Sequence, residues 1–406
     1  MEIETFTLPN GLRFVHKRVQ SAVAYCGLTV DVGARDELKP EHGMAHFLEH
    51  MLFRGTKRRT SMQISTLLED QGGDLNAFTT KEETAVHAVV LLGDLSKAFD
   101  IIADIVLNPT FPPDELEKEK DVVCDEINLY FDNPSDLIFD DFEELMFPTS
   151  SLGRSILGSE RSLSRFSQED LRRFSERCYA TGRMAFASVG DFSISKVEAL
   201  AERYFAKAPR AEREVPRVPP EAYCKFRKKR KRSTYQAHCL LGNRTFSYAH
   251  ERRYALYLLA NMLGGPSQNS LLNLALRETH GLAYGVEVAA TLYSDCGAAT
   301  IYFGTDKRSV NRCLQVVEEE LVRLCTDKLP EARLLQTQKQ LLGQLAIGEE
   351  SSEQVMLGLG KSMLAYGKVS TFEEVAEHIR AVTPEQLRDV AREVFTPQEL
   401  SLLTYV

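Results

Sequence analysis

Residues 167–189 read SQEDLRRFSERCYATGRMAFASV, and residues 383–406 read TPEQLRDVAREVFTPQELSLLTYV. Each stretch begins with a helix-capping residue, has a Glu two positions later and then a Leu-Arg pair, reaches an aromatic residue and ends in a strand-like run. Ser167 matches Thr383, and Tyr179 matches Phe395 at the same offset. The sequence therefore predicts two copies of one domain, which suits 406 residues and domains of about 200.

A weaker echo extends the repeat toward the middle of each half. The stretches TVDVGARDE (29–37) and MAHFLEHMLF (44–53) match LLGNRTFS (240–247) and ALYLLANMLG (255–264). Where the first copy has HFLEH, the second offers only Tyr257, Leu258, Ala260 and Asn261, which cannot bind zinc. We therefore expect no second active site in the second half.

The order of elements predicts an α+β fold of two homologous domains, each a mostly antiparallel sheet with helices packed on one face. Asn10-Gly11 marks a hairpin, residues 22–32 indicate a strand, and residues 76–92 alternate as strands do. Helices are predicted at about 43–53, 61–71, 94–107, 114–131, 135–146, 167–179 and 194–205. We expect the domains at 1–208 and 233–406, joined by a linker at 209–232.

The linker contains the most basic stretch of the chain, residues 225–232. A solvated linker or the first strand of the second half is the favoured interpretation. A nucleic-acid patch or localisation signal is the alternative, disfavoured because the whole chain carries a net charge of −9. We expect no nucleic-acid partner.

Composition is typical of a folded soluble protein, with 43% hydrophobic and 26% charged residues. No apolar run is long enough for a spanning helix, so no membrane association is expected. The acidic, strand-like N-terminus lacks the layout of a signal or transit peptide, and for a full-length chain this predicts a cytoplasmic protein. The eight scattered cysteines include no CxxC pair, which indicates reduced and mostly buried thiols.

The pattern that indicates chemistry lies in HGMAHFLEHMLFRGT, residues 42–56. On a helix, His46 and His50 project from one face about one turn apart, with Glu49 beside the second. Imidazoles at that spacing can share a tetrahedral metal ion, while the carboxylate reaches a metal-bound water. Solvated or core histidines are the alternative. His42 extends the series, but Gly43 places it at the helix entrance, so we do not expect it to be a ligand.

A catalytic zinc needs a third protein ligand, and PPDELEKEKDVVCDEINLYFDNP at 112–134 is the best source. Prolines and paired acids open a helix there, and Glu119 and Glu126 lie seven residues apart on one face. The other carboxylates are interpreted as a solvated acidic face. Cys124 points about 200° around the helix from Glu126 and is left out.

The motif and its surroundings resemble the inverted-zincin peptidases, the family of pitrilysin, insulin-degrading enzyme and the mitochondrial processing peptidase. MLFRGT, GGDLNAFTTKEET, DEINLYFDNP and LGRSILG resemble blocks of that family in the same order. The resemblance implies one Zn²⁺ per chain, held by His46, His50 and Glu126. It also implies that Glu49 is the general base and that Glu119 orients a ligating imidazole, which agrees with the chemistry of such groups.

In the second half, ALRETHGLAYGVEV (275–288) carries Arg277 and Tyr284. The resemblance implies that this pair lies across a cavity from the zinc, contacts substrate and stabilises the tetrahedral oxyanion. A salt-bridged helix end and a core tyrosine are the alternatives. Because four-domain members of the family are much longer, the resemblance also implies a homodimer, with a heterodimer containing a metal-free partner as the alternative. The loop LGGPSQNS (263–270) has fewer glycines than expected of the family.

GGDLNAFTT (72–80) predicts a strand whose edge could pair with an extended peptide, with a plain sheet strand as the alternative. Asn76, Ala77 and Thr79 are the predicted substrate-binding residues, the first two because of the resemblance. We therefore expect a zinc metalloendopeptidase that hydrolyses peptides or unfolded segments in a closed chamber, with a zinc-bound water activated by Glu49. A non-catalytic scaffold or peptide-binding subunit of the same fold is the alternative.

Overall fold

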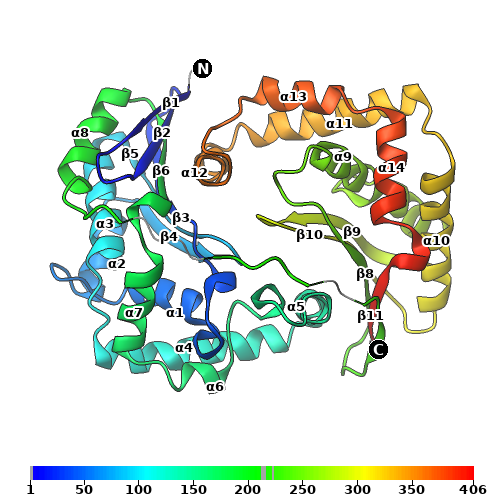
Figure 1. Ribbon diagram of the computed structural model, residues 1–406, viewed down its shortest axis with the longest axis horizontal. Coiled ribbons are helices and arrows are strands. Elements are labelled where there is room, and N and C mark those ends of the chain that lie inside the picture. The colour runs from blue at the N-terminus through cyan, green and yellow to red at the C-terminus, as the bar shows by residue number, and fades with distance from the viewer. Residues whose placement is uncertain (1–2, 212–215, 222–223) are drawn as a thin grey trace. The chain divides into compact units, whose positions relative to one another are not determined.

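The computed structural model describes residues 3–211, 216–221 and 224–406. The chain divides into two compact units, each built around one sheet (Figure 1). Unit 1 comprises Met1–Asn128, Arg154–Val218 and Ile347–Val369, and unit 2 comprises Leu129–Gly153, Pro219–Ala346 and Ser370–Val406. The expected domains were contiguous, whereas each unit takes in a segment from the other half of the chain.

Unit 1 has a six-stranded sheet in the order β1-β2-β6-β3-β5-β4. Its strands are β1 (Ile3–Thr7), β2 (Arg13–Arg18), β3 (Val23–Val30), β4 (Asp74–Thr79), β5 (Thr84–Leu91) and β6 (Met184–Gly190). All neighbours are antiparallel except β2 and β6. The predicted hairpin joins β1 to β2, and Gly11 in its turn has a φ of 90°, a conformation that favours glycine. Strand β4 lies at an edge of the sheet.

The helices of unit 1 other than α12 (Ser352–Tyr366) share one hydrophobic core with this sheet. They are α1 (Met44–Leu52), α2 (Ser61–Glu69), α3 (Leu95–Leu107), α4 (Pro113–Phe131), α6 (Glu160–Leu163), α7 (Gln168–Cys178) and α8 (Ile194–Tyr204). Phe47, Phe99 and Phe186 are fully buried in the shared core. Each such side chain contributes about 1.5–3 kcal/mol by leaving water.

Unit 2 repeats this design around a five-stranded sheet in the order β7-β11-β8-β10-β9. Its strands are β7 (Arg227–Arg230), β8 (Ala237–Thr245), β9 (Ala283–Leu292), β10 (Gly297–Thr305) and β11 (Ser401–Tyr405). Its helices include α9 (Arg253–Gly264), the π-helix η6 (Asn273–Thr279), α10 (Val310–Thr326), α11 (Glu331–Gly348), α13 (Phe372–Arg380) and α14 (Pro384–Val394). The described residues also form short 3-10 turns. In unit 1 these are η1 (Ala34–Asp36), η2 (Lys39–Glu41), η3 (Leu92–Asp94) and η5 (Thr181–Arg183), and in unit 2 they are η4 (Ser151–Gly153) and η7 (Pro397–Glu399).

The predicted repeat and fold class are confirmed strand by strand. The series β2-β6-β3-β5-β4 corresponds to β7-β11-β8-β10-β9, and in both series the first pair is parallel and the others are antiparallel. Helices α7 and α14 also correspond. Ser167 and Thr383 cap them by accepting the backbone N–H of the third helical residue, which satisfies a donor that the helix cannot.

The exchanged segments add one helix to the opposite face of each sheet. In unit 1, α12 (Ser352–Tyr366) packs Met356 and Leu359 against Ala187 of β6. In unit 2, α5 (Pro134–Met146) packs Phe142 and its neighbours against the sheet, and Asp141 accepts a hydrogen bond from the Tyr405 hydroxyl. Each of these two helices covers a sheet face that the other helices of its unit leave exposed, and this burial stabilises the exchange of segments between the halves.

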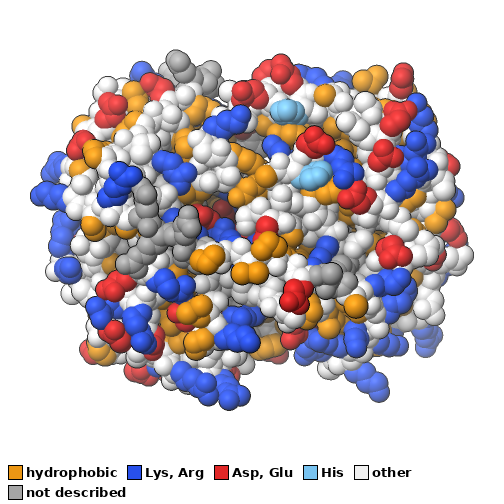
Figure 2. Space-filling view, viewed as in Figure 1, with side chains coloured by type: hydrophobic (Ala, Val, Ile, Leu, Met, Phe, Trp, Pro, Cys, Tyr) orange, Lys and Arg blue, Asp and Glu red, His pale blue; other side chains and the backbone are white. Residues whose placement is uncertain are grey.

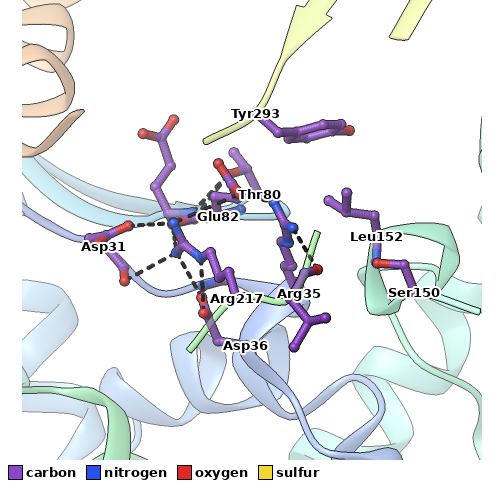
Figure 3. A network of polar contacts seen from close by, with 12 residues as sticks. Asp31, Arg35, Asp36, Thr80, Glu82, Ser150, Leu152, Arg217 and Tyr293 are labelled. Atoms are coloured by element: carbon purple, nitrogen blue, oxygen red, sulfur yellow. Dashed lines mark hydrogen bonds and ion pairs between the residues drawn. The ribbon is translucent and has the colours of Figure 1, made fainter. Parts of the chain in front are cut away.

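The stretch between the halves is only partly a linker. Its basic residues 227–230 form edge strand β7, one of the two favoured interpretations, and on the face seen in Figure 2 basic side chains are interspersed with acidic and uncharged ones. Before it, Arg217 is held in unit 1 by Asp31 and Asp36 at 2.8 and 2.9 Å, in a charge network (Figure 3). The expected exposed linker is therefore anchored at Arg217, because the buried carboxylate of Asp36 needs a cation there.

Among the described residues, no helix is both long and apolar enough to cross a membrane. All eight cysteines are free, and four of them are buried: Cys26, Cys178, Cys239 and Cys313.

Candidate metal centre

A close backbone contact fixes the start of α1, the helix that carries HFLEH. Gly43, at its N-cap, has a φ of 90°, and Gly158 has a φ of 77°. A Cβ on Gly43 would lie 2.7 Å from the Cα of Gly158, closer than real side chains allow. Only glycine suits either position, because the conformation and the space both exclude a side chain. This contact gives the LGRSILG block a structural role.

The first turn of α1 is capped by a carboxyl group from outside the helix. The backbone N–H groups of Gly43 and Ala45 donate to Glu37 Oε2 and Oε1, each at 2.9 Å. Glu37 is only 5% exposed, and burial raises its pKa to about 8 although these bonds and Arg154 oppose the shift. Sequence reasoning missed Glu37, since its six-residue distance from the cap matches no local capping pattern.

Three side chains converge as the sequence predicts. Nε2 of His46 and Nε2 of His50 each lie 3.6 Å from Glu126 Oε2, and the three ligand atoms all lie within 4.8 Å of one another. Tetrahedral zinc with bonds of about 2.0–2.1 Å would place such atoms about 3.3 Å apart. The donor set is therefore the right type and spacing for zinc. In the described part of the chain it is the one group of three or more potential ligands so close together.

The protonation of the two histidines is set by their surroundings. Burial, with the nearby charge of His50, lowers the pKa of His46 to about 3. Such a neutral imidazole is the form that binds a metal. For His50, burial also acts to lower the pKa, but the bond to Glu119 and the other nearby carboxylates raise it overall.

Glu119 lies behind His50, away from the proposed metal position. Its Oε1 is 2.8 Å from His50 Nδ1, and its Oε2 pairs with Arg54 Nε. The carboxyl is 2% exposed; burial would raise its pKa, but the bonds to His50 and Arg54 lower it overall. An anionic acceptor on Nδ1 leaves Nε2 as the free lone pair and fixes the ring, the geometry that the predicted orienting role requires.

Glu49 lies on α1 between the two histidines in sequence and is 8% exposed. Thr79 of β4 donates its hydroxyl proton to Glu49 Oε2 at 2.6 Å. Burial raises the pKa of Glu49, while the bond from Thr79 and the proximity of His50 oppose the shift. A buried carboxylate with a raised pKa beside a metal site is suited to accept and return a proton.

Strand β4 brings the other predicted substrate-binding residues to the sheet edge. Asn76 is exposed and Ala77 half-buried, and both pair with β5 on one side only. The Asn76 side chain accepts from the N–H of Ala77 at 2.9 Å. The strand thus offers an unpaired edge next to α1, a place where an extended peptide could add.

His42 contacts the backbone and is not a metal ligand, as expected. Its Nε2 lies 3.1 Å from the carbonyl oxygen of Ser155, and it does not belong to the ligand group.

In unit 2, Tyr284 is 63% exposed, which excludes the core alternative. The side chain of Arg277 is 50% exposed and lies 3.7 Å from Glu278 at the end of the π-helix. Their predicted roles toward substrate stay predictions.

Two family profiles match the chain in succession. The profile of insulinase, peptidase family M16, matches residues 13–160, and that of the peptidase M16 inactive domain matches residues 165–341. The second name agrees with a half in which Tyr257 and Asn261 replace the histidines.

Relatives of similar length support the match. An uncharacterized zinc protease of Bacillus subtilis is 35% identical over 97% of this chain and 96% of its own length. The beta subunit of the mitochondrial-processing peptidase of Bos taurus is 29% identical over 96% of this chain and 81% of its own. A protease from Helicobacter pylori, a solved structure, has the same fold, with a TM-score of 0.91 at 20% identity over 100% of this chain and 99% of its own.

Proposed function

The chain belongs to the peptidase M16 family, and on that basis we propose that it is a zinc-dependent endopeptidase that cleaves peptides or unfolded polypeptide segments. One observation carries the proposal: His46, His50 and Glu126 bring three ligand atoms within 4.8 Å of one another. Glu49, the candidate base, lies on the same helix as both histidines. A scaffold would have no need of this combination.

The residues have distinct tasks in this proposal. His46, His50 and Glu126 would hold the zinc, which when bound supplies Lewis-acid activation of a water and of the scissile carbonyl. Glu49 accepts the proton of the attacking water and gives it to the leaving amine. Glu119 keeps the ring of His50 in the tautomer with a free Nε2.

The substrate would bind as an added strand. The free edge of β4 offers backbone donors and acceptors to an extended peptide, next to the helix that carries Glu49. A folded protein seldom presents such a strand, so the preferred substrates are short or unfolded peptides. Asn76 and Ala77 are the residues of this edge expected to contact them.

The test compares the wild type with Glu49→Gln. Both proteins should bind about one zinc per chain, and only the wild type should cleave a quenched peptide library. Zinc in the wild type without cleavage by either protein would favour the scaffold alternative. A wild type that binds no zinc would show the ligand assignment to be wrong.

We further propose a homodimer whose closed chamber includes Arg277 and Tyr284. Both side chains are exposed and able to reach a ligand, and an arginine is a suitable donor to an oxyanion. Mixing Glu49→Gln with Arg277→Ala should restore part of the activity when two chains share each site. Confirmed mixed dimers with no recovery would count against sharing, and a heterodimer with a metal-free partner would then be the form to examine.

A further inference from the structure

We infer that Thr79 is a positioning residue for the reaction: its hydroxyl holds one oxygen of Glu49 so that the other stays free to take the proton. The inference rests on the proposed function and assigns Thr79 a role different from the predicted substrate contact. It concerns a contact between side chains that are thirty residues apart in sequence, Thr79 on the edge strand and Glu49 on α1.

The hydroxyl proton of Thr79 is committed to Glu49. Thr79 Oγ1 lies 2.6 Å from Glu49 Oε2, the short distance typical of a hydroxyl bonded to an anion. The other hydroxyl nearby belongs to Thr84, 3.4 Å away, and its proton goes to the carbonyl oxygen of Val32 at 2.9 Å. A threonine has one proton to donate, so a Thr79 that donates to Glu49 has none for a substrate.

The sheet holds this donor in place. Thr79 and Thr84 are directly paired in the register of β4 and β5, at the end of the hairpin that joins the two strands. Thr84 is 1% exposed, so the partner side of the hairpin is anchored in the interior. A β-branched side chain in a strand has few χ1 rotamers, which keeps the hydroxyl aimed at α1.

Fixing Glu49 Oε2 has a chemical consequence. A carboxylate on a flexible Glu side chain would otherwise rotate among several orientations, and only some of them aim an oxygen at the attacking water. With Oε2 held by Thr79, Oε1 remains for proton transfer in a constant direction. Displacing a base by even a small distance costs large factors in rate.

The two roles of Thr79 predict different kinetics. If Thr79 positions Glu49, Thr79→Val should lower kcat about 10- to 100-fold, as expected for loss of a hydrogen bond to a charged group, and leave KM nearly unchanged. Thr79→Ser keeps the hydroxyl and should recover most of kcat. If Thr79 contacts substrate, the valine variant should raise KM instead.

A binding measurement separates the roles without catalysis. In a Glu49→Gln background loaded with zinc, a fluorescent peptide substrate of the wild type should bind equally well with Thr or Val at position 79. Weaker binding with valine would overturn the inference. Zinc content and the unfolding midpoint of each variant check that the site and fold survive. Thr5→Val, the same exchange at an exposed position of β1 in the same sheet, is the matched control.

Different results would overturn the proposed peptidase function and the positioning role of Thr79. Wild-type cleavage with full kcat in Thr79→Val would overturn the inference and leave the proposed function standing. A fall in kcat that Thr79→Ser does not recover would also overturn it, because the loss would then come from packing. No cleavage by the zinc-loaded wild type would overturn the proposed function and this inference together.

Discussion

Replacing Glu119 by glutamine should weaken zinc binding without removing any ligand. The carboxylate is 2% exposed and acts as a double acceptor, with Oε1 2.8 Å from His50 Nδ1 and Oε2 paired with Arg54. A glutamine has the same shape but only one acceptor oxygen, so its NH2 group must face one of the two donors. Either the imidazole of His50 loses its orientation or the partly exposed guanidinium of Arg54 loses its partner.

The expected size follows from what such partners contribute. Loss of a group that orients a ligating histidine typically reduces metal affinity about 10- to 100-fold, or about 1.4–2.7 kcal/mol. The affinity is measured by competition with a chromophoric chelator at fixed pH. Glu117→Gln on the same helix is the matched control, because the side chain of Glu117 is 71% exposed and forms a surface ion pair with Lys120.

If Glu119→Gln bound zinc within about twofold of the wild type, the hydrogen bond to His50 would contribute nothing measurable to metal binding. A loss of affinity shared by Glu117→Gln would point to the general negative charge of α4 as the cause.

Three further predictions concern stability. The pKa of Glu37 is about 8 in the folded chain, which lies above the value in the unfolded chain. The folded state therefore keeps a proton that the unfolded state releases, and stability should fall as pH rises from about 4.5 to 8. In urea unfolding, the stability of Glu37→Gln should depend less on pH than that of the wild type, and an unchanged dependence would contradict this. Gly360→Val places a Cβ 2.6 Å from Thr29 Oγ1 and should cost about 1–3 kcal/mol in denaturant unfolding, whereas Gly358→Val, which has open space, should cost less. Arg217→Ala removes the nearer of the two arginines beside the buried Asp36, leaving Arg183 at 3.8 Å, and should cost about 1.5–3 kcal/mol by the same measurement. The exposed Arg172→Ala should cost less than about 1 kcal/mol, and equal losses would argue against the buried network.

Local patterns predicted what depends on local spacing. The four-residue separation of His46 and His50 places both side chains on one face of a helix, whatever surrounds that helix. The cap and the apolar stripe around them were enough to locate the ends of α1 to within about one residue. A second amphipathic helix with clear end signals placed Glu119 and Glu126 on one face, and the family resemblance was needed to choose Glu126 as the ligand. Fold class followed from the order of strands and helices, and the repeat showed that the same packing occurs twice.

Sequence reasoning missed the residue Glu37 and the contact of Thr79 with Glu49, because both depend on long-range contacts. Glu37 caps α1 from outside the helix, and its identity as a cap depends on how η1 and η2 turn the chain back. Thr79 reaches Glu49 only because a hairpin and a helix meet. The exchange of α5 and α12 was invisible because each helix has an ordinary amphipathic pattern, which says that a face is buried but not against which sheet.

The exchange of segments has a consequence for how the chain is made. During synthesis, the sheet of unit 1 has all its strands once residue 190 has emerged, yet the helix that covers Ala187 ends only at Tyr366. Until then one apolar face of the nascent sheet stays uncovered, so the first half cannot finish folding before most of the second has been translated. We expect the bare face to attract chaperones at that stage, and any truncation before α12 to yield an aggregation-prone fragment instead of a working half.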